Sequence, residues 1–273
     1  MTLILNDRER AMLAEMGVKV WLPPASPAPP AAPASAPNAE AARPAAARAT
    51  PAPALGPRPS GVESMDWPAL QAAVAGCRAC GLCAGRTQTV FGVGSRAADW
   101  MVVGEAPGET EDRQGQPFVG QAGKLLDNML AAVGLSRHAG LELENAAAGA
   151  GAEAPKDAGK KGVYIANVLK CRPPANRNPQ PNEVAQCEPY LRRQVALVRP
   201  KIILAMGRFA VQSLLQTTDP IGRLRGRAHH YEGVPVIVTY HPAYLLRALS
   251  EKAKAWQDLC LALKVAGENR TTK

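Results

Sequence analysis

The chain has 273 residues, which is enough for one domain of ordinary size with appendages. Its formal net charge of +9 and isoelectric point near 9.4 favour nucleic acid over a membrane as partner, although a merely basic protein would carry the same charge. No apolar run approaches the roughly 20 residues of a membrane helix, and the N-terminus lacks a signal-peptide core. We therefore expect a cytoplasmic protein whose cysteines bind metal or stay free rather than form disulfides.

The N-terminal part of the chain has two segments of different composition. Residues 1–22 are expected to form a short amphipathic helix, because their apolar residues recur at helical spacing. Residues 23–60 hold 12 of the chain's 25 prolines, many alanines and no aromatic residue. Such a segment cannot bury enough apolar surface to offset its ordering entropy, so it is predicted to be a disordered linker. The globular domain is expected at residues 61–273.

Strands and helices alternate along this domain. Apolar strands are predicted at residues 100–104, 163–169, 201–206 and 234–240. Helices are predicted at residues 120–134, 182–198, 208–215 and 250–266. Strands separated by helices indicate an α/β fold with a parallel four-stranded sheet flanked by helices. Residues 136–161 are rich in Ala, Gly and charge without periodicity, and we expect a flexible insertion there.

Four of the six cysteines have the spacing of a metal site. Cys77 and Cys80 form a C-x2-C pair, and Cys171 and Cys187 form a C-x15-C pair much later in the chain. Two such pairs, brought together by the fold, can supply four thiolates to a 4Fe–4S cluster or to a structural zinc ion. Spacing alone leaves both alternatives open.

Three polar motifs follow predicted strands and are expected at one edge of the sheet, where open α/β sheets bind ligands. The turn GEAPGETED, residues 104–112, is crowded with carboxylates, which suits water activation or stabilisation of a cation better than phosphate binding; a plain surface turn is the alternative. Asn167 interrupts an apolar strand, so its amide either reads a ligand or bridges loops. His241 follows the last strand, where an imidazole can donate to an oxyanion or serve a structural role.

Other residues suggest a planar ligand and contacts with phosphate. Phe118 lies in the loop QPFVG rather than on a periodic apolar face, and it is either a stacking platform for a base or a small hydrophobic plug. Basic loops and a wedge after the last strand are predicted to contact DNA or, alternatively, to be solvated turns. The candidate DNA contacts are Arg172, Arg177, Arg225, Leu246 and Arg247.

Together these residues resemble the family-four uracil-DNA glycosylases of the uracil-DNA glycosylase superfamily. The resemblance covers about residues 62–266 and rests on motifs in a fixed order: CRAC, GEAPGETED, RQGQPFVG, YIANVLKCRPP, a further cysteine and YHPAYLLR. Each motif is weak alone, whereas the ordered set is specific. The resemblance implies a parallel-sheet α/β fold that carries a 4Fe–4S cluster and removes uracil from DNA, initiating base excision repair.

The resemblance also implies roles for individual residues. It favours iron–sulfur over zinc, with Cys77, Cys80, Cys171 and Cys187 as the cluster ligands. Around the extruded base it implies two groups. Glu105, Glu111 and His241 are the catalytic group, for the water and the oxyanion, and Ala106, Phe118 and Asn167 bind the substrate. The loop before the last cluster cysteine holds no histidine, which a covalently trapping branch uses, so ordinary hydrolysis with turnover is implied.

Some residues and alternatives remain outside this assignment. Cys83 has no assigned role, and Cys260 is expected in the core. An iron–sulfur DNA-binding accessory without catalysis and a zinc-stabilised binding module are the alternative classes. Strand preference and activity on other deaminated bases do not follow from the sequence.

The N-terminal segment has a resemblance of its own. Residues 10–24, RAMLAEMGVKVWLPP, are similar to the N-terminus of the psi subunit of the bacterial replicative clamp loader, where a Leu-x-x-Met-Gly-Ile/Val-x-x-Trp pattern binds the chi subunit. The resemblance implies docking to the polymerase chi subunit. A helix that packs on its own domain is the alternative. We expect a monomer that is associated with the bacterial nucleoid.

Overall fold

The computed structural model describes residues 56–139 and 159–268. The expected docking segment at residues 1–22, nearly all of the linker at 23–60 and the centre of the expected insertion lie outside the described residues. Within the described part, no helix is long and apolar enough to cross a membrane.

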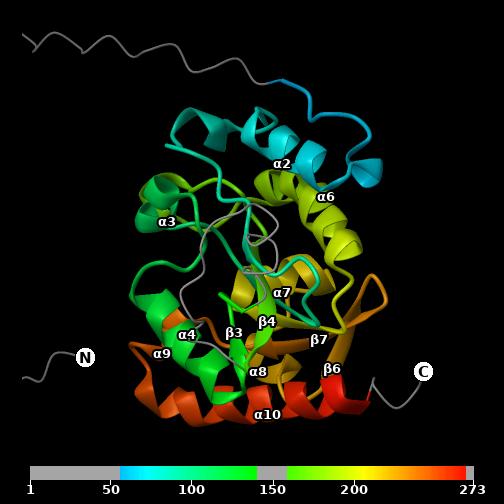
Figure 1. The fold of residues 1–273 in the computed structure, drawn as a ribbon. Coiled ribbons are helices and arrows are strands. Elements are labelled where there is room, and N and C mark those ends of the chain that lie inside the picture. Colours follow the sequence, from blue (N-terminus) through cyan, green and yellow to red (C-terminus); the bar gives the residue numbers. More distant parts are fainter. Residues whose placement is uncertain (1–55, 140–158, 269–273) are drawn as a thin grey trace, which may run out of the picture. The chain divides into compact units, whose positions relative to one another are not determined.

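The domain is built on a mixed sheet of seven strands (Figure 1), in the order β1-β4-β2-β5-β7-β6, with β3 paired to β4 outside this path. The strands are β1 Val93–Gly94, β2 Trp100–Gly104, β3 Leu135–Ser136, β4 Lys161–Asn167, β5 Ile202–Met206, β6 Ala228–Tyr231 and β7 Val234–Thr239. The central strands β4, β2, β5 and β7 run parallel, whereas β1 and β6 pair antiparallel at the two edges. The four predicted strands are confirmed, and the three shorter strands were not predicted.

Helices cover both faces of this sheet. The α-helices are α2 Trp67–Ala75, α3 Glu109–Gln114, α4 Gln121–Ala132, α6 Pro181–Val198, α7 Arg208–Leu215, α8 Ile221–Leu224, α9 Pro242–Leu245 and α10 Lys252–Glu268. Short 3-10 helices are η1 Val62–Ser64, η2 Gly81–Ala84, η3 Pro174–Asn176 and η4 Leu249–Glu251. One core packs α6 and α7 on the sheet, and the other packs α4 and α10 on it. Alternate strand residues enter opposite cores: Met101 and Val103 belong to the first, Trp100 and Val102 to the second.

The boundaries of the expected insertion at residues 136–161 differ from the prediction. Ser136 is part of β3, Arg137 is buried, and Lys161 begins β4. The alanine- and glycine-rich composition lies between Arg137 and Lys161 and includes none of these three residues. Cys260 also differs from the prediction, because it lies exposed on α10 rather than in the core.

Candidate active site

The carboxyl ends of the central strands open onto a pocket of about 840 Å³. The segments that follow β2, β4, β5 and β7 line it, as expected for a parallel sheet. All six residues implied around the base lie in its wall: Glu105, Ala106, Glu111, Phe118, Asn167 and His241. Three segments distant in sequence are thus brought together at one site.

Asn167 is the last residue of β4, and it is one of the residues that line the pocket. Its side chain is 2% exposed, and its Oδ1 has no hydrogen-bond partner among the described residues. Gly104 lies opposite Asn167 on β2, and a Cβ at Gly104 would be 2.4 Å from this oxygen and 2.6 Å from the Phe118 ring. Only glycine therefore leaves both side chains in place. An orphaned buried acceptor is costly, so stability alone does not account for this amide.

The Phe118 ring and the His241 imidazole form one side of the pocket. The ring centroids are 5.4 Å apart and the planes meet at 25°, which is a stacked arrangement. Phe118 is buried, with 5% of its surface exposed. Its ring also meets Gly104, so the aromatic side chain is held between the strand end and the imidazole. Phe118 also belongs to the second core, so its position suits both of its predicted roles, the stacking platform and the hydrophobic plug.

His241 is the N-cap residue of α9, and this role fixes its tautomer. Its Nδ1 accepts a hydrogen bond from the Ala243 N–H at 3.1 Å, so the proton of the neutral ring is on Nε2. Burial lowers the pKa of His241 to about 4; Glu111 opposes this shift and Arg247 adds to it. At neutral pH the imidazole is therefore an uncharged donor through Nε2.

The two candidate catalytic carboxylates also hold the backbone around the pocket. Glu105 Oε1 accepts the Phe209 N–H at 2.9 Å, at the start of α7. Burial raises the pKa of Glu105, and hydrogen bonds from backbone N–H groups at the start of α7 partly oppose the shift. Glu111 Oε1 accepts the N–H groups of Val119 and Gly120 at 3.1 and 3.3 Å. Both carboxylates thus combine a place in the pocket wall with a structural contact.

The four candidate ligand cysteines line one small cavity, together with Cys83, Arg86 and Lys170. Arg86 Nη1 donates to Cys171 Sγ at 3.1 Å, and burial raises the pKa of Cys171 to about 11 and that of Cys187 to about 12. Among the described residues, no set of three or more His, Cys, Asp or Glu side chains is arranged to hold a single metal ion. Ala106 packs against the cysteine cluster and also lines the pocket, so the two sites adjoin.

The candidate DNA contacts differ in their distance from the pocket: some line it or lie beside it, and others do not. Arg177 and Arg247 line the pocket, and Leu246 is 43% exposed just before Arg247. Arg177 pairs with Glu183 at the start of α6. Arg172 is 24% exposed and pairs with Glu109 at 3.3 Å.

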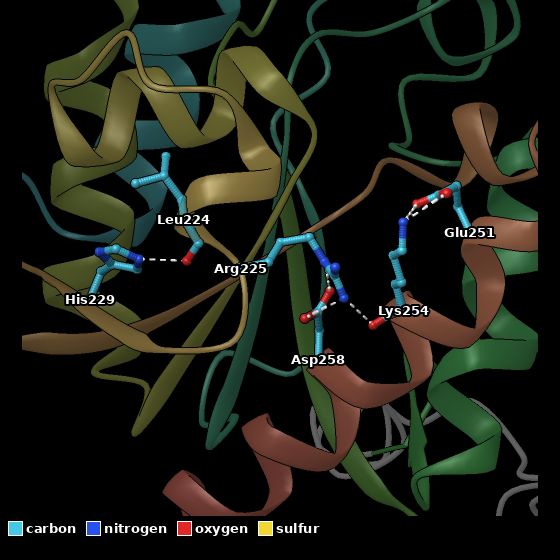
Figure 2. Close-up of polar contacts among 6 residues, drawn as sticks. All are labelled: Leu224, Arg225, His229, Glu251, Lys254 and Asp258. Atoms are coloured by element: carbon cyan, nitrogen blue, oxygen red, sulfur yellow. Dashed lines mark hydrogen bonds and ion pairs between the residues drawn. The ribbon is translucent and has the colours of Figure 1, made fainter.

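Arg225 lies in an internal ion pair with Asp258 of α10 (Figure 2). Its Nε and Nη2 donate to the Asp258 oxygens at 2.6 and 2.9 Å, and Nη2 also donates to the Lys254 carbonyl. The guanidinium covers the Tyr240 ring at 4.9 Å. With 11% of its side chain exposed, Arg225 offers little charge to phosphate, which corrects its prediction as a DNA contact. Sequence reasoning missed this pair because its partners are 33 residues apart.

Arg208 is a pocket residue that the sequence analysis did not select. It is exposed at the first position of α7 and lines the pocket, with its guanidinium over the Phe209 ring at 5.4 Å. The signal available in the sequence was its place directly after the third predicted strand. A basic side chain there faces the same edge as the three polar motifs.

This fold and pocket define a class of α/β proteins with a polar pocket at the carboxyl edge of the sheet beside a cysteine-lined cavity. A family profile described as "Uracil DNA glycosylase superfamily" matches residues 91–260. The chain belongs to this superfamily and, within it, to the type-4 uracil-DNA glycosylases, as three curated relatives of that name show.

The relatives share most of their length with this chain. The Archaeoglobus fulgidus protein is 43% identical over 178 residues, which cover 62% of this chain and 78% of the relative. The Sulfurisphaera tokodaii protein is 36% identical over 219 residues, covering 72% and 90% respectively. The Thermotoga maritima protein is 38% identical over 180 residues, covering 65% and 82%. The family expected from the ordered motifs is thereby confirmed.

Proposed function

We propose that this protein hydrolyses the N-glycosidic bond of uracil in DNA, leaves an abasic site and so initiates base excision repair. Its membership of the type-4 uracil-DNA glycosylases supports this activity. The observation that carries the proposal is the buried, unpartnered Oδ1 of Asn167 at the wall of the pocket. In the proposal this acceptor pairs with a donor of the extruded base.

Asn167 reads the edge of uracil, and Phe118 stacks on its ring. The amide offers Oδ1 to the N3–H of uracil and an N–H to O4, whereas cytosine presents the opposite pattern at these positions. A site built for hydrogen bonds rejects an analogue that leaves its buried groups unpaired. Stacking on the buried Phe118 ring adds affinity without selecting the base. The pair therefore accounts for selection of uracil.

His241 stabilises the negative charge that develops on the departing base. Its Nε2 carries the proton because Nδ1 is occupied by the Ala243 N–H, so the neutral ring donates to the uracil oxyanion. Glu105 and Glu111 lie on the same pocket wall, where their negative charge stabilises the positive charge that develops on the sugar. They also provide the carboxylate that orients the attacking water. Ala106 lies between them and leaves room for the base.

We further propose that Cys77, Cys80, Cys171 and Cys187 hold a 4Fe–4S cluster. The donor set fits in kind, because all four cysteines line one cavity and thiolates are the usual ligands of such clusters. Arg86 and Lys170 place positive charge beside thiolates that must be deprotonated to bind iron. A bound cluster would join the turn at Cys77 to the loop that begins at Cys171, and its role is structural.

DNA is proposed to cross the mouth of the pocket. Arg177 and Arg247 supply positive charge at the rim, and Arg172 lies on the same loop as Arg177. The exposed Leu246 is placed to fill the gap that the extruded nucleotide leaves in the stack.

A uracil-release assay on single- and double-stranded oligonucleotides tests the function. Wild-type protein should release uracil but not cytosine, and binding without release would identify a DNA-binding accessory instead. Phe118→Ala and His241→Ala should lower single-turnover excision strongly, to a rate that is still measurable, but keep DNA binding. Cys260→Ser, which alters an exposed thiol on α10, is the matched control and should behave as wild type.

We also propose that residues 10–24 dock to the chi subunit of a bacterial replicative polymerase and bring repair to the nucleoid. The support is the order of Leu13, Met16, Gly17, Val18 and Trp21, which matches the psi pattern. A pull-down with residues 1–24 tests it, with Trp21→Ala as control. Absence of chi binding, or binding unchanged by Trp21→Ala, would refute the docking. Deleting residues 1–55 should leave excision from free oligonucleotides intact.

A further inference from the structure

The backbone of Phe118 has an unusual conformation for a residue with a bulky side chain. Its φ is 55°, in the left-handed region that favours glycine. Such a conformation persists only where the surrounding structure fixes it. Its ring is nevertheless buried and stacked on His241, in the pocket wall. Some contact must therefore hold this backbone against its own preference.

Arg137 makes that contact on the N-terminal side of Phe118. Its Nη1 donates to the Pro117 carbonyl at 2.9 Å, and its Nε pairs with Asp127 of α4 at 2.7 Å. The Pro117 carbonyl belongs to the peptide bond that enters Phe118, so fixing its direction restricts φ of Phe118. The guanidinium is 5% exposed, and its Nη2 has no hydrogen-bond partner among the described residues. Burying a cation with one donor unused is unfavourable, so pairing alone does not account for its position.

Glu111 holds the backbone on the other side. Its Oε1 accepts the two amides that follow Phe118, those of Val119 and Gly120. Two oppositely charged side chains thus hydrogen-bond the backbone around Phe118: Arg137 binds the carbonyl before it, and Glu111 binds the amides after it. The C-terminal side is also tight, because a Cβ at Gly123 would lie 1.7 Å from the Phe118 carbonyl oxygen.

We infer that Arg137 is a positioning residue for excision: by fixing the Pro117 carbonyl it holds Phe118, and through the stacked ring His241, in the arrangement that receives uracil. This inference rests on the proposed function, in which Phe118 is the platform for the base. Arg137 is not among the residues that line the pocket. It acts only through the loop.

The test replaces Arg137 with Met, which keeps most of the side-chain volume and removes the donors. We expect single-turnover excision by Arg137→Met to fall by about tenfold to 100-fold, because small displacements of a positioning group have effects of that size. Inhibition by free uracil should weaken in parallel, while affinity for abasic DNA stays unchanged. Arg137→Lys, which retains one donor, should recover part of the rate.

Arg193→Met is the matched control. Arg193 Nε donates to the Met65 carbonyl at 2.6 Å, which is the same kind of contact, but neither residue lies in the pocket wall. Its excision rate and uracil inhibition should stay within about twofold of wild type, since a contact remote from the site does not move the reacting groups. A loss equal to that of Arg137→Met would overturn the inference.

A double-mutant cycle separates this inference from the proposed function. If Arg137 acts through Phe118, Arg137→Met should cause no further loss in Phe118→Ala. The same loss in both backgrounds would overturn the inference, whereas a normal rate for Phe118→Ala alone would overturn the platform assignment instead. Should Arg137→Met not fold, Asp127→Ala is the second variant, because it removes the half-exposed carboxylate that pairs with the same guanidinium. It should lower excision in the same direction, and a wild-type rate would refute the positioning role.

Discussion

Asn167→Ala and Gln194→Ala test whether a buried amide serves binding or stability. Asn167 is buried at 2% exposure, yet its Oδ1 has no partner within the described chain. Gln194 is the matched control: its amide is also buried, but it accepts from Lys170 and donates to the Phe91 carbonyl and the Tyr164 hydroxyl. The same truncation to Ala therefore has opposite expected consequences at the two positions.

The magnitudes follow from which groups lose partners. In Asn167→Ala, bound uracil would keep two buried polar groups unpaired, at about 1–3 kcal/mol each. Since about 1.4 kcal/mol corresponds to a factor of ten, kcat/KM should fall by roughly 30-fold to 10⁴-fold. Folding stability should stay constant or rise, because an orphaned acceptor is removed. In Gln194→Ala, three groups lose partners at about 1–3 kcal/mol each, so the free energy of unfolding should fall by several kcal/mol.

Single-turnover excision and urea unfolding measure the two quantities. Excision by Gln194→Ala is compared at a temperature where the variant remains folded. A fall in the stability of Asn167→Ala comparable to that of Gln194→Ala would show that the Asn167 amide is structural. Wild-type excision by Asn167→Ala would refute its role in reading the base.

Four further predictions concern charge and metal. In the native protein the pKa of His241 is about 4, below the ordinary value of 6.5, so the unfolded state takes up the proton first. The free energy of unfolding should therefore fall as the pH drops from 6.5 through 4. In His241→Gln this part of the pH dependence should be missing from acid unfolding curves. Arg225→Ala should lower unfolding free energy by about 3–5 kcal/mol, because it leaves a buried carboxylate unpaired, without changing the salt dependence of DNA binding. Arg247→Ala should do the converse, reducing the salt slope by about 1 at unchanged stability; exchanged outcomes would reverse the two assignments. Cys171→Ala should lose bound iron and the visible absorbance of the cluster, whereas Cys260→Ser should keep both; normal iron content in Cys171→Ala would exclude Cys171 as a ligand.

The central sheet could be predicted because its strands are buried on both faces. Every residue of β2 and β5 is buried, so each strand appears in the sequence as a continuous apolar run. The missed strands carry no such signal: β1 and β3 have two residues each, and β6 is the partly exposed segment AHHY. The helix α3 was also missed. It is wholly polar, and its acidic first turn and the left-handed Gly115 at its end define it instead of an apolar face.

Cys260 shows why residue type alone misplaces a side chain. Cysteine is among the residues most often buried, which favoured a core position. The helix α10 faces the sheet with Ala255, Leu259, Ala262 and Ala266, and Cys260 lies outside this stripe. The position of Cys260 relative to the helical period therefore decides that it is exposed. This period could be read from the sequence.

The sequence predicted residues that the structure brings to one pocket, but it did not predict the contacts that orient them. Topology places the ends of parallel strands at one edge, so a motif after each strand suffices to bring Glu105, Asn167 and His241 together. The contacts that orient them join residues far apart in sequence, such as Glu105 and the Phe209 amide, 104 residues later. No local period or spacing encodes such a pair. The hydrogen bond from Arg137 to the Pro117 carbonyl is another contact that the sequence does not encode locally. The composition around Arg137 indicated an insertion instead.

Three locally unfavourable features meet at this one pocket, and their coincidence has a physical meaning. Asn167 keeps a buried acceptor without a partner, His241 stays neutral through burial, and Phe118 has a left-handed backbone. Selection for stability alone would remove each of them, because a paired amide, a solvated imidazole and a glycine cost less. In the proposed mechanism each feature suits one demand of excision: an acceptor for N3–H, an uncharged donor for the leaving oxygen, and a ring on which the base stacks. The pocket is therefore organised for an extruded uracil before DNA binds, which limits the reorganisation that catalysis requires.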